Sequence, residues 1–231
     1  MDATGPPDIV VVAGGTVPAR AVAVPSSAFV VAADSGVALA RTLGLSVDVA
    51  VGDFDSLTPD LVERLDDLAD EVRRHPVHKD ATDLELALDV ALERGPARVL
   101  VVGLEGGRPD HALANLLVAA APAFGSLDVE LVLDHGHAWV VRDRLVGRWP
   151  SDTTISLIPV HGAATVSIDG VRWPLDHSTL TPGTTRGVSN STLPDRTGSD
   201  AATVTVHDGV VICIVPRTIP PPVPPTMEIT P

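Results

Sequence analysis

The chain has 231 residues, of which 45% are hydrophobic and only 3% aromatic, so Val, Leu and Ala must fill its core. Its formal net charge of −14 argues against nucleic acid as a partner, because phosphate backbones are bound by clustered Lys and Arg. Its single cysteine, Cys213, lies in an apolar run and excludes both an intrachain disulfide and a multi-cysteine zinc site. No apolar stretch is long enough to span a bilayer and the N-terminus lacks a signal-peptide pattern, so we expect a soluble cytoplasmic protein.

Short apolar runs alternate with helical patterns over the first 136 residues. The runs are typical of buried strands and comprise residues 9–13, 29–33, 47–51, 72–77, 98–104 and 129–133. Helical patterns lie between them at about residues 37–43, 58–69, 84–92 and 111–121. This alternation predicts an α/β domain over residues 1–136 that is built on a doubly wound, mostly parallel sheet.

The pattern changes after residue 136, beyond which we find no convincing helix. Short β-prone runs cover residues 139–141, 153–159, 164–168, 203–207 and 210–215, and Pro- and Gly-rich turns separate them. This spacing predicts a small all-β antiparallel sandwich over residues 137–217. Residues 218–231 contain prolines at 220, 221, 222, 224, 225 and 231, which predicts a disordered tail.

Two carboxylates leave the third predicted strand together, in the stretch Gly52-Asp53-Phe54-Asp55-Ser56. Open α/β sheets bind ligands at the carboxyl ends of their strands. Paired carboxylates at that edge suit Mg²⁺, which takes oxygen ligands and commonly binds together with substrate phosphates. Gly, Asp and Ser are also turn formers, so this stretch alone leaves a metal site and a plain surface turn equally open.

Three further predicted strand ends carry acids or glycines, namely Asp34, Asp80 with Asp83, and Gly106 to Asp110. In a doubly wound sheet all four ends lie along one edge, within reach of a common ligand. Asp80 and Asp83 are also spaced like a capping box, with Asp80 as the N-cap of the following helix. Repetition at successive strand ends nevertheless favours a shared ligand over turn chemistry.

The glycine pair Gly106-Gly107 precedes a predicted helix and adds a means of binding phosphate. A helix N-terminus offers free backbone N–H groups to phosphate, and Arg108 adds a bidentate donor. Transfer of a phosphoryl or pyrophosphoryl group depends mainly on positioning and on neutralising phosphate charge. Because carboxylates repel phosphate oxygens, this acidic edge can hold ATP only together with bridging Mg²⁺.

These segments, taken in order, resemble thiamine pyrophosphokinases. The N-terminal match consists of Ala33-Asp34-Ser35-Gly36, Gly52-Asp53-Phe54-Asp55-Ser56, Asp80-Ala81-Thr82-Asp83-Leu84-Glu85 and Gly106-Gly107-Arg108-Pro109-Asp110-His111. The C-terminal segments Trp173-Pro174-Leu175 and Gly187-Val188-Ser189-Asn190 are similar to the thiamine-binding segment of that family. The resemblance covers roughly residues 8 to 216 and is most specific at the Gly-Asp-Phe-Asp-Ser and Ser-Asn elements.

The resemblance implies transfer of a pyrophosphoryl group from ATP to the hydroxyl of thiamine, which yields thiamine diphosphate and AMP. It also implies a homodimer in which the α/β domain binds the nucleotide and the sandwich serves thiamine binding and dimerisation. Thiamine would then lie between the α/β domain of one subunit and the sandwich of the other, with no membrane partner.

By matched position, the resemblance implies three groups of site residues. Catalysis would fall to Asp53, Asp55 and Asp83, and the Mg²⁺ ligands would be these three together with Asp34. The ATP side would comprise Asp34, Gly36, Lys79, Thr82, Gly107 and Arg108. The thiamine side would comprise Asp110, Trp173, Ser189 and Asn190.

Two of these regions carry a second interpretation. In one interpretation the aromatic face of Trp173 stacks on the cationic thiazolium ring of thiamine. In the other, equally open, Trp173 is an ordinary tryptophan in the core of the sandwich. The family usually has two glycines after the first Asp, and here Ser35 replaces one of them. A serine is tolerated there if the position needs no positive φ.

Two rival functions remain open. One is a pyrophosphokinase for another hydroxymethyl substrate such as a pterin, against which Trp173 and the Ser189-Asn190 pair weigh. The other is a non-catalytic thiamine or nucleotide sensor, which has little need of a full set of acidic residues.

The pair His135 and His137 lacks an acid or Cys partner at ligand spacing, so we do not assign it to a metal. Neither a P-loop nor a G-x-S-x-G sequence is present.

Replacing a metal-binding carboxylate tests the assignment directly. We expect Asp55→Asn and Asp83→Asn each to abolish turnover and leave the fold intact, because an amide keeps the shape of the side chain and loses its charge. Formation of thiamine diphosphate and the circular dichroism spectrum of each variant measure the two effects. Near-normal activity in both variants would contradict the metal assignment.

Overall fold

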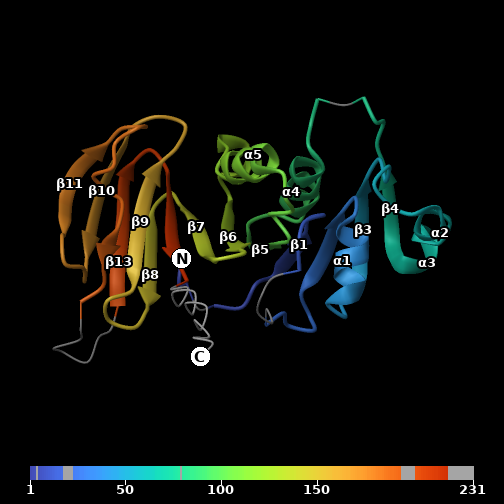
Figure 1. Cartoon of the computed structure of the whole chain (residues 1–231), viewed down its shortest axis with the longest axis horizontal. Coiled ribbons are helices and arrows are strands. Elements are labelled where there is room, and N and C mark those ends of the chain that lie inside the picture. Colours follow the sequence, from blue (N-terminus) through green and yellow to red (C-terminus); the bar gives the residue numbers. More distant parts are fainter. Residues whose placement is uncertain (4, 18–22, 79, 194–200, 218–231) are drawn as a thin grey trace, which may run out of the picture.

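The molecule is built on a ten-stranded sheet, and a four-stranded sheet packs against one end of it (Figure 1). The computed structural model describes residues 1–3, 5–17, 23–78, 80–193 and 201–217. The predicted ATP-side residue Lys79 and the Pro-rich segment 218–231 lie outside these ranges. In the view of Figure 1 the parallel strands occupy the right half and the antiparallel layers the left.

Six strands form the parallel part of the large sheet, in the order β6-β5-β1-β2-β3-β4. Their bounds are β1 Ile9–Val12, β2 Phe29–Ala33, β3 Val47–Gly52, β4 Ala69–Arg74, β5 Ala97–Val102 and β6 Leu127–Leu133. From β1 the chain proceeds through β2, β3 and β4 in one direction, whereas β5 and β6 lie on the other side of β1. The crevice between the carboxyl ends of β1 and β5 is therefore a topological switch point, where such sheets bind ligands.

Helices pack on both faces of these strands. They are α1 Gly36–Thr42, α2 Pro59–Glu63, α3 Leu65–Leu68, α4 Asp83–Glu93 and α5 Pro109–Ala119, with a 3₁₀ turn at Pro122–Phe124. Val11 belongs to the same buried core as Leu88 of α4, while the neighbouring Val12 belongs to the core that contains Val37 of α1. Successive side chains of a strand point to opposite faces, so burial on both faces explains why the central strands β1, β2, β3 and β5 read as apolar runs.

The segment from residue 58 to residue 74 differs from its prediction. A single helix over residues 58–69 is wrong, because the helix is interrupted at Arg64 (φ −106°, ψ 9°) and the chain enters β4 at Ala69. The strand begins at Ala69, three residues before the predicted start at Val72. The prediction missed this start because two of the first three residues are charged. Strand β4 is an edge of the sheet, and exposed charges such as Asp70 and Glu71 are common at such edges and conceal the strand pattern.

The antiparallel part continues the large sheet and adds a second layer. Strands β7 Gly136–Val141, β14 Val211–Pro216, β9 Thr154–Pro159 and β12 Asn190–Ser191 extend the ten-stranded sheet beyond β6. Strands β8 Arg144–Arg148, β10 Ala164–Asp169, β11 Leu175–Leu180 and β13 Ala201–Asp208 form the four-stranded sheet. The predicted mostly parallel sheet followed by antiparallel strands is confirmed in this coarse form.

A shared apolar core holds the two antiparallel layers together. Ile155 and Cys213 of the large sheet and Val166 and Leu145 of the small one all lie in this core. Cys213 is fully buried, and burial raises the pKa of its thiol, as expected for an inert side chain.

The predicted boundary between residues 136 and 137 falls at the start of β7, which pairs antiparallel with β6 in the same sheet. None of the helices in the described part of the chain is long and apolar enough to cross a membrane.

The central core sets the stability of the α/β part. Leu131 of β6 is fully buried, so we expect Leu131→Ala to lower the free energy of unfolding by about 2–5 kcal/mol through lost burial and a residual cavity. Chemical denaturation followed by circular dichroism measures this change. Leu113→Ala, at a leucine that is 61% exposed, is the matched control and should shift stability by no more than about 0.5 kcal/mol. Equal losses in both variants would contradict the assignment of the core.

Candidate active site

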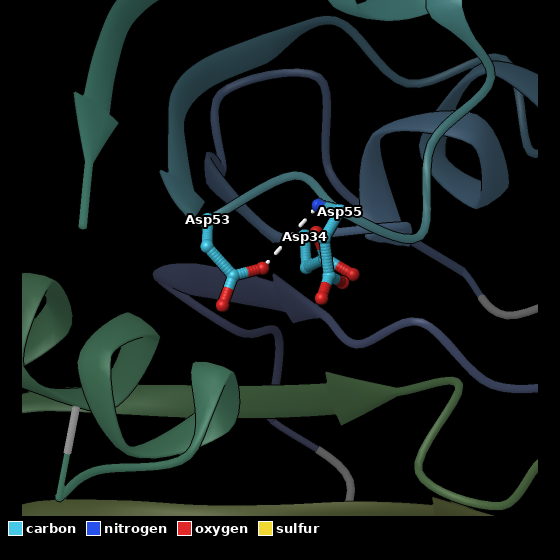
Figure 2. Close-up of side chains that lie close together, drawn as sticks. All are labelled: Asp34, Asp53 and Asp55. Atoms are coloured by element: carbon cyan, nitrogen blue, oxygen red, sulfur yellow. Dashed lines mark hydrogen bonds between the residues drawn. The ribbon is translucent and has the colours of Figure 1, made fainter. Parts of the chain in front are cut away.

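Three carboxylates converge where strands β2 and β3 end. Asp34 follows β2 directly, while Asp53 and Asp55 follow β3. One side-chain oxygen from each of the three lies within 4.8 Å of the others, and Figure 2 shows their carboxylates gathered on one side of the turn. Among the residues that the structure describes, this is the one group of three or more His, Cys, Asp or Glu side chains close enough to share a metal ion. It coincides with the predicted metal ligands, apart from Asp83.

The backbone around Gly52 and Phe54 brings these acids together. Gly52 has φ +148°, and a Cβ at this position would lie 3.2 Å from the Cα of Asp34, so only glycine lets β3 end so close to β2. Phe54 adopts φ 61°, which is costly for a bulky residue and needs firm anchoring. Its ring is 2% exposed, packs into the core on the α1 face and lies 5.5 Å from the guanidinium carbon of Arg74. Burial of Phe54 thereby holds Asp53 and Asp55 on the ligand side of the turn.

Like charges dominate the electrostatics of this group. The pKa of Asp55 is raised, first by the charge of Asp53, then by partial burial and by the charges of Asp34 and Asp83. Asp34 is 7% exposed, and its Oδ2 atom accepts a hydrogen bond from the Ser56 hydroxyl. Its Oδ1 atom is buried without a hydrogen-bond partner. A buried carboxylate oxygen without a hydrogen-bond partner, next to carboxylates that repel one another, provides the oxygen ligands that a hard divalent cation prefers.

A cavity of about 450 Å³ opens beside these acids, at the switch point of the sheet. Its wall combines the loops after β1, β2 and β5 with the N-terminal ends of α4 and α5. The lining residues include the predicted Asp34, Asp55, Thr82, Asp83 and Arg108. They also include Gly14, Gly15, Gly103 and Asn115, which we did not predict as site residues, and Ser56 and His111, which belong to the matched segments but had no assigned role. Asn115 lies one helical turn after His111, a spacing that marks a common helix face and that could have identified it.

Thr82 and Asp83 line the cavity at the start of α4. The Thr82 hydroxyl accepts a hydrogen bond from the backbone N–H of Glu85 over 3.2 Å, so Thr82 is the N-cap and the prediction of Asp80 in that role is wrong. Both Asp80-to-Asp83 and Thr82-to-Glu85 have capping-box spacing, and only the actual start of the helix decides between them. The N-terminal end of this helix, with Thr82, Asp83 and Leu84, therefore lines the ligand space.

Arg108 and Asp110 pair with each other on the outer side of the cavity. The Arg108 Nη2 atom lies 2.5 Å from Asp110 Oδ2, and its Nε atom lies 3.2 Å from Oδ1. This bidentate bond lowers the pKa of Asp110 to about 2. The resemblance places the two residues on different substrates, so the structure adds a link between the predicted ATP and thiamine sides.

The first helix packs closely onto the end of β1. Ser35 has φ −60° as the N-cap residue of α1, so this position needs no positive φ and tolerates a serine. A Cβ at Gly14 would lie 1.9 Å from the Ser35 hydroxyl oxygen, and one at Gly36 would lie 1.9 Å from the carbonyl oxygen of Val12. The serine thus fits because glycines surround it, and the predicted Gly36 serves close packing.

Three of the four predicted thiamine-side residues, Trp173, Ser189 and Asn190, lie in the antiparallel part, whereas Asp110 lies in α5. Trp173 is 58% exposed, its backbone N–H donates to Asn190 Oδ1 (3.1 Å), and Asn190 Nδ2 donates to the Trp173 carbonyl (2.7 Å). The N–H of Ser189, a residue with φ 60°, donates to the Ser156 hydroxyl over 3.0 Å. Asn190 therefore braces the loop that presents Trp173, and none of the three predicted residues lines the cavity of the described chain.

Two segments of the chain match domain models of one enzyme family. The model described as "Thiamin pyrophosphokinase, catalytic domain" matches residues 22–131, and "Thiamin pyrophosphokinase, vitamin B1 binding domain" matches residues 145–211. The two segments together cover more than half of the chain. The chain belongs to the thiamine pyrophosphokinase family.

Relatives within this family extend the likeness over most of the chain. A thiamine pyrophosphokinase of Bacillus subtilis (strain 168) is 28% identical over 184 residues, which represent 78% of this chain and 84% of the relative. The crystal structure of thiamine pyrophosphokinase from Bacillus subtilis has a TM-score of 0.75 at 26% identity and covers 91% of this chain and 99% of that one. A thiamin pyrophosphokinase family protein from Enterococcus faecalis shares the fold, with a TM-score of 0.77 at 24% identity and coverage of 91% and 99%.

Like-charge repulsion among these acids predicts an unusual effect of Asp55→Asn on stability. Because folding raises the pKa of Asp55, its charged form disfavours the folded state at neutral pH. We expect the metal-free variant to melt at a higher temperature than the metal-free wild type near neutral pH. The difference should shrink as the pH falls through the raised pKa, where the wild-type side chain also becomes neutral.

Thermal denaturation in a chelating buffer, at neutral pH and in acid, measures the difference. Asp70→Asn on the exposed edge strand β4 makes the same chemical change outside the group formed by Asp34, Asp53 and Asp55, and it serves as the control. Equal or lower thermal stability of the Asp55→Asn variant at neutral pH would contradict the repulsion.

Proposed function

We propose that the protein transfers the pyrophosphoryl group of ATP to the hydroxyl group of thiamine, which yields thiamine diphosphate and AMP. The observation that carries this proposal is the group Asp34, Asp53 and Asp55 beside the switch-point cavity, in a chain of the thiamine pyrophosphokinase family. Acids at this position suit phosphate chemistry only together with a cation, and the family supplies the reaction class.

Asp34, Asp53, Asp55 and Asp83 are the residues that would hold Mg²⁺. Two features of the protein support this assignment, namely the unpartnered Asp34 Oδ1 atom and the like-charge repulsion that raises the pKa of Asp55. When bound, the cation supplies positive charge between the carboxylates and the phosphate oxygens of ATP. Ser56 donates to Asp34 and orients that carboxylate, so it is a positioning residue in this assignment.

The protein groups around the cavity are suited to hold the triphosphate. The backbone lies close to the ligand space where glycines line the cavity, at Gly14 and Gly15 after β1 and at Gly106 after β5. The N-terminus of α4 adds N–H groups at Thr82 and Asp83. Arg108 supplies a guanidinium group at the cavity wall. We also keep Gly36, Gly107 and Lys79 as ATP-side residues on the strength of the resemblance.

The proposed transfer joins the hydroxyl oxygen of thiamine to the β-phosphorus of ATP. The bond from that phosphorus to the oxygen bridging to the α-phosphate breaks, AMP leaves with the bonding electrons, and the hydroxyl proton is released. Such transfers depend mainly on alignment and charge neutralisation. The chain contributes a fixed edge of acids, helix N-termini and glycine loops to that alignment.

Thiamine would bind through the antiparallel part of a second subunit. The vitamin B1 binding segment contains Trp173, Ser189 and Asn190, and the exposed indole face of Trp173 suits a cationic thiazolium ring. Because these residues do not line the cavity of their own described chain, a homodimer with a shared site accounts for their placement. We accordingly assign the nucleotide to residues 1–136 and thiamine binding and dimerisation to residues 137–217.

A direct assay tests the proposal. Incubation of the protein with thiamine, ATP and Mg²⁺ should yield thiamine diphosphate and AMP in equal amounts, and a chelator should stop both, as measured by chromatography. AMP formed only when a hydroxymethylpterin replaces thiamine would favour the rival pyrophosphokinase. Binding of thiamine without either product would favour a sensor.

A further inference from the structure

Three loops that are distant in the sequence meet beside the cavity and are joined by one cluster of polar contacts. Thr16 follows the glycines after β1, Glu105 lies in the loop after β5, and Asp134 lies in the turn between β6 and β7. We call these three residues the loop clamp. None of them lines the cavity or belongs to the group of acids described above.

The contacts of the loop clamp are short and connect all three loops. The Thr16 N–H donates to the Glu105 carbonyl over 2.5 Å, and the Thr16 hydroxyl oxygen lies 3.0 Å from that carbonyl and 2.9 Å from Asp134 Oδ1. The Asp134 N–H donates to Glu105 Oε2 over 2.5 Å. Two of these contacts involve carboxylates, and charge-assisted hydrogen bonds are about twice as strong as neutral ones.

The loops after β1 and β5 touch through their backbones. The Gly15 N–H donates to the Gly103 carbonyl over 2.8 Å. A Cβ at Gly15 would lie 2.0 Å from the Glu105 carbonyl oxygen, and one at Gly106 would lie 2.9 Å from the Gly15 Cα. With no side chains between them, the relative position of the two loops depends on their hydrogen bonds. The clamp supplies the contacts immediately next to the glycines.

These same glycines form the cavity wall. Gly15, Gly103 and Gly106 all line the cavity, so a shift between the two loops changes the shape of the space offered to the ligand. Asp134 lies in the turn that leads into β7, so the clamp also ties this wall to the first strand of the antiparallel part. The clamp is therefore placed to control cavity shape without contact with the ligand.

We propose that Thr16, Glu105 and Asp134 are positioning residues that set nucleotide affinity by holding the two glycine loops in register. This inference rests on the proposed function, in which the cavity binds MgATP. The clamp acts on binding of the nucleotide, and it leaves the acids that serve the transfer itself untouched.

Thr16→Val is the decisive variant because valine keeps the shape of threonine and lacks its hydroxyl. We expect it to raise the KM for ATP and the dissociation constant for MgATP by about tenfold, as for one lost charge-assisted hydrogen bond. The kcat and the KM for thiamine should stay within about twofold of the wild type. Thr16→Ser restores the hydroxyl and should restore the KM for ATP.

Glu105 offers a second matched pair. Glu105→Gln retains an acceptor for the Asp134 N–H and should remain close to the wild type, whereas Glu105→Ala removes it and should weaken MgATP binding as Thr16→Val does. Because both residues belong to one cluster, the double variant Thr16→Val/Glu105→Ala should lose less than the product of the two single effects.

Calorimetric titration with MgATP in the absence of thiamine measures affinity without turnover and separates this inference from the proposed reaction. Wild-type protein that binds MgATP but forms no thiamine diphosphate would refute the reaction and leave the clamp testable by affinity. An unchanged MgATP affinity in Thr16→Val would overturn the clamp, as would a wild type that binds no MgATP. Parallel losses in kcat, both KM values and melting temperature, with no rescue by Thr16→Ser, would reveal a purely structural role and overturn it too.

Discussion

Repulsion among the carboxylates of Asp34, Asp53 and Asp55 is the constraint on which the α/β part of this protein depends. Their oxygens lie within 4.8 Å of one another, and the charge of Asp53 is the first cause of the raised pKa of Asp55. Acids this close stay together only where the backbone holds them. The buried ring of Phe54 and the close approach of Gly52 to Asp34 provide that hold. Apolar burial thus opposes an electrostatic cost that a bound cation would relieve.

The same sheet edge combines this acidic group with a wall of nearly bare backbone. Strand order reverses between β1 and β5, and the glycine loops that follow them lie side by side in the cavity wall. The ten-stranded sheet then continues through β7 into the antiparallel part, which contains the vitamin B1 binding segment. One hydrogen-bonded sheet therefore links the region that we assign to the nucleotide with the region that we assign to thiamine, and the contacts of Asp134 lie at the junction.

Sequence patterns predicted the buried elements better than the exposed ones. Strands β1, β2, β3 and β5 are buried on both faces and therefore read as apolar runs, whereas β6 exposes Asp128. Strand β4 starts in charged residues, and β11 buries only Leu180, so the first was placed too late and the second was missed. The prediction of Asp80 as N-cap was also wrong, because Thr82 and Glu85 have the same capping-box spacing and only the start of the helix decides between the two.

The amino-acid sequence alone reveals the acids and glycines at successive strand ends, the change from α/β to all-β patterning and the resemblance to one enzyme family. Which of these groups meet is known only from the three-dimensional arrangement of the strands. The bracing of Trp173 by Asn190 and the contact of Thr16 with Asp134 join segments that are separate in the sequence and lie outside any local pattern. The physical reason is that a local pattern encodes burial and turns, whereas contacts between loops depend on strand order, which no single segment contains.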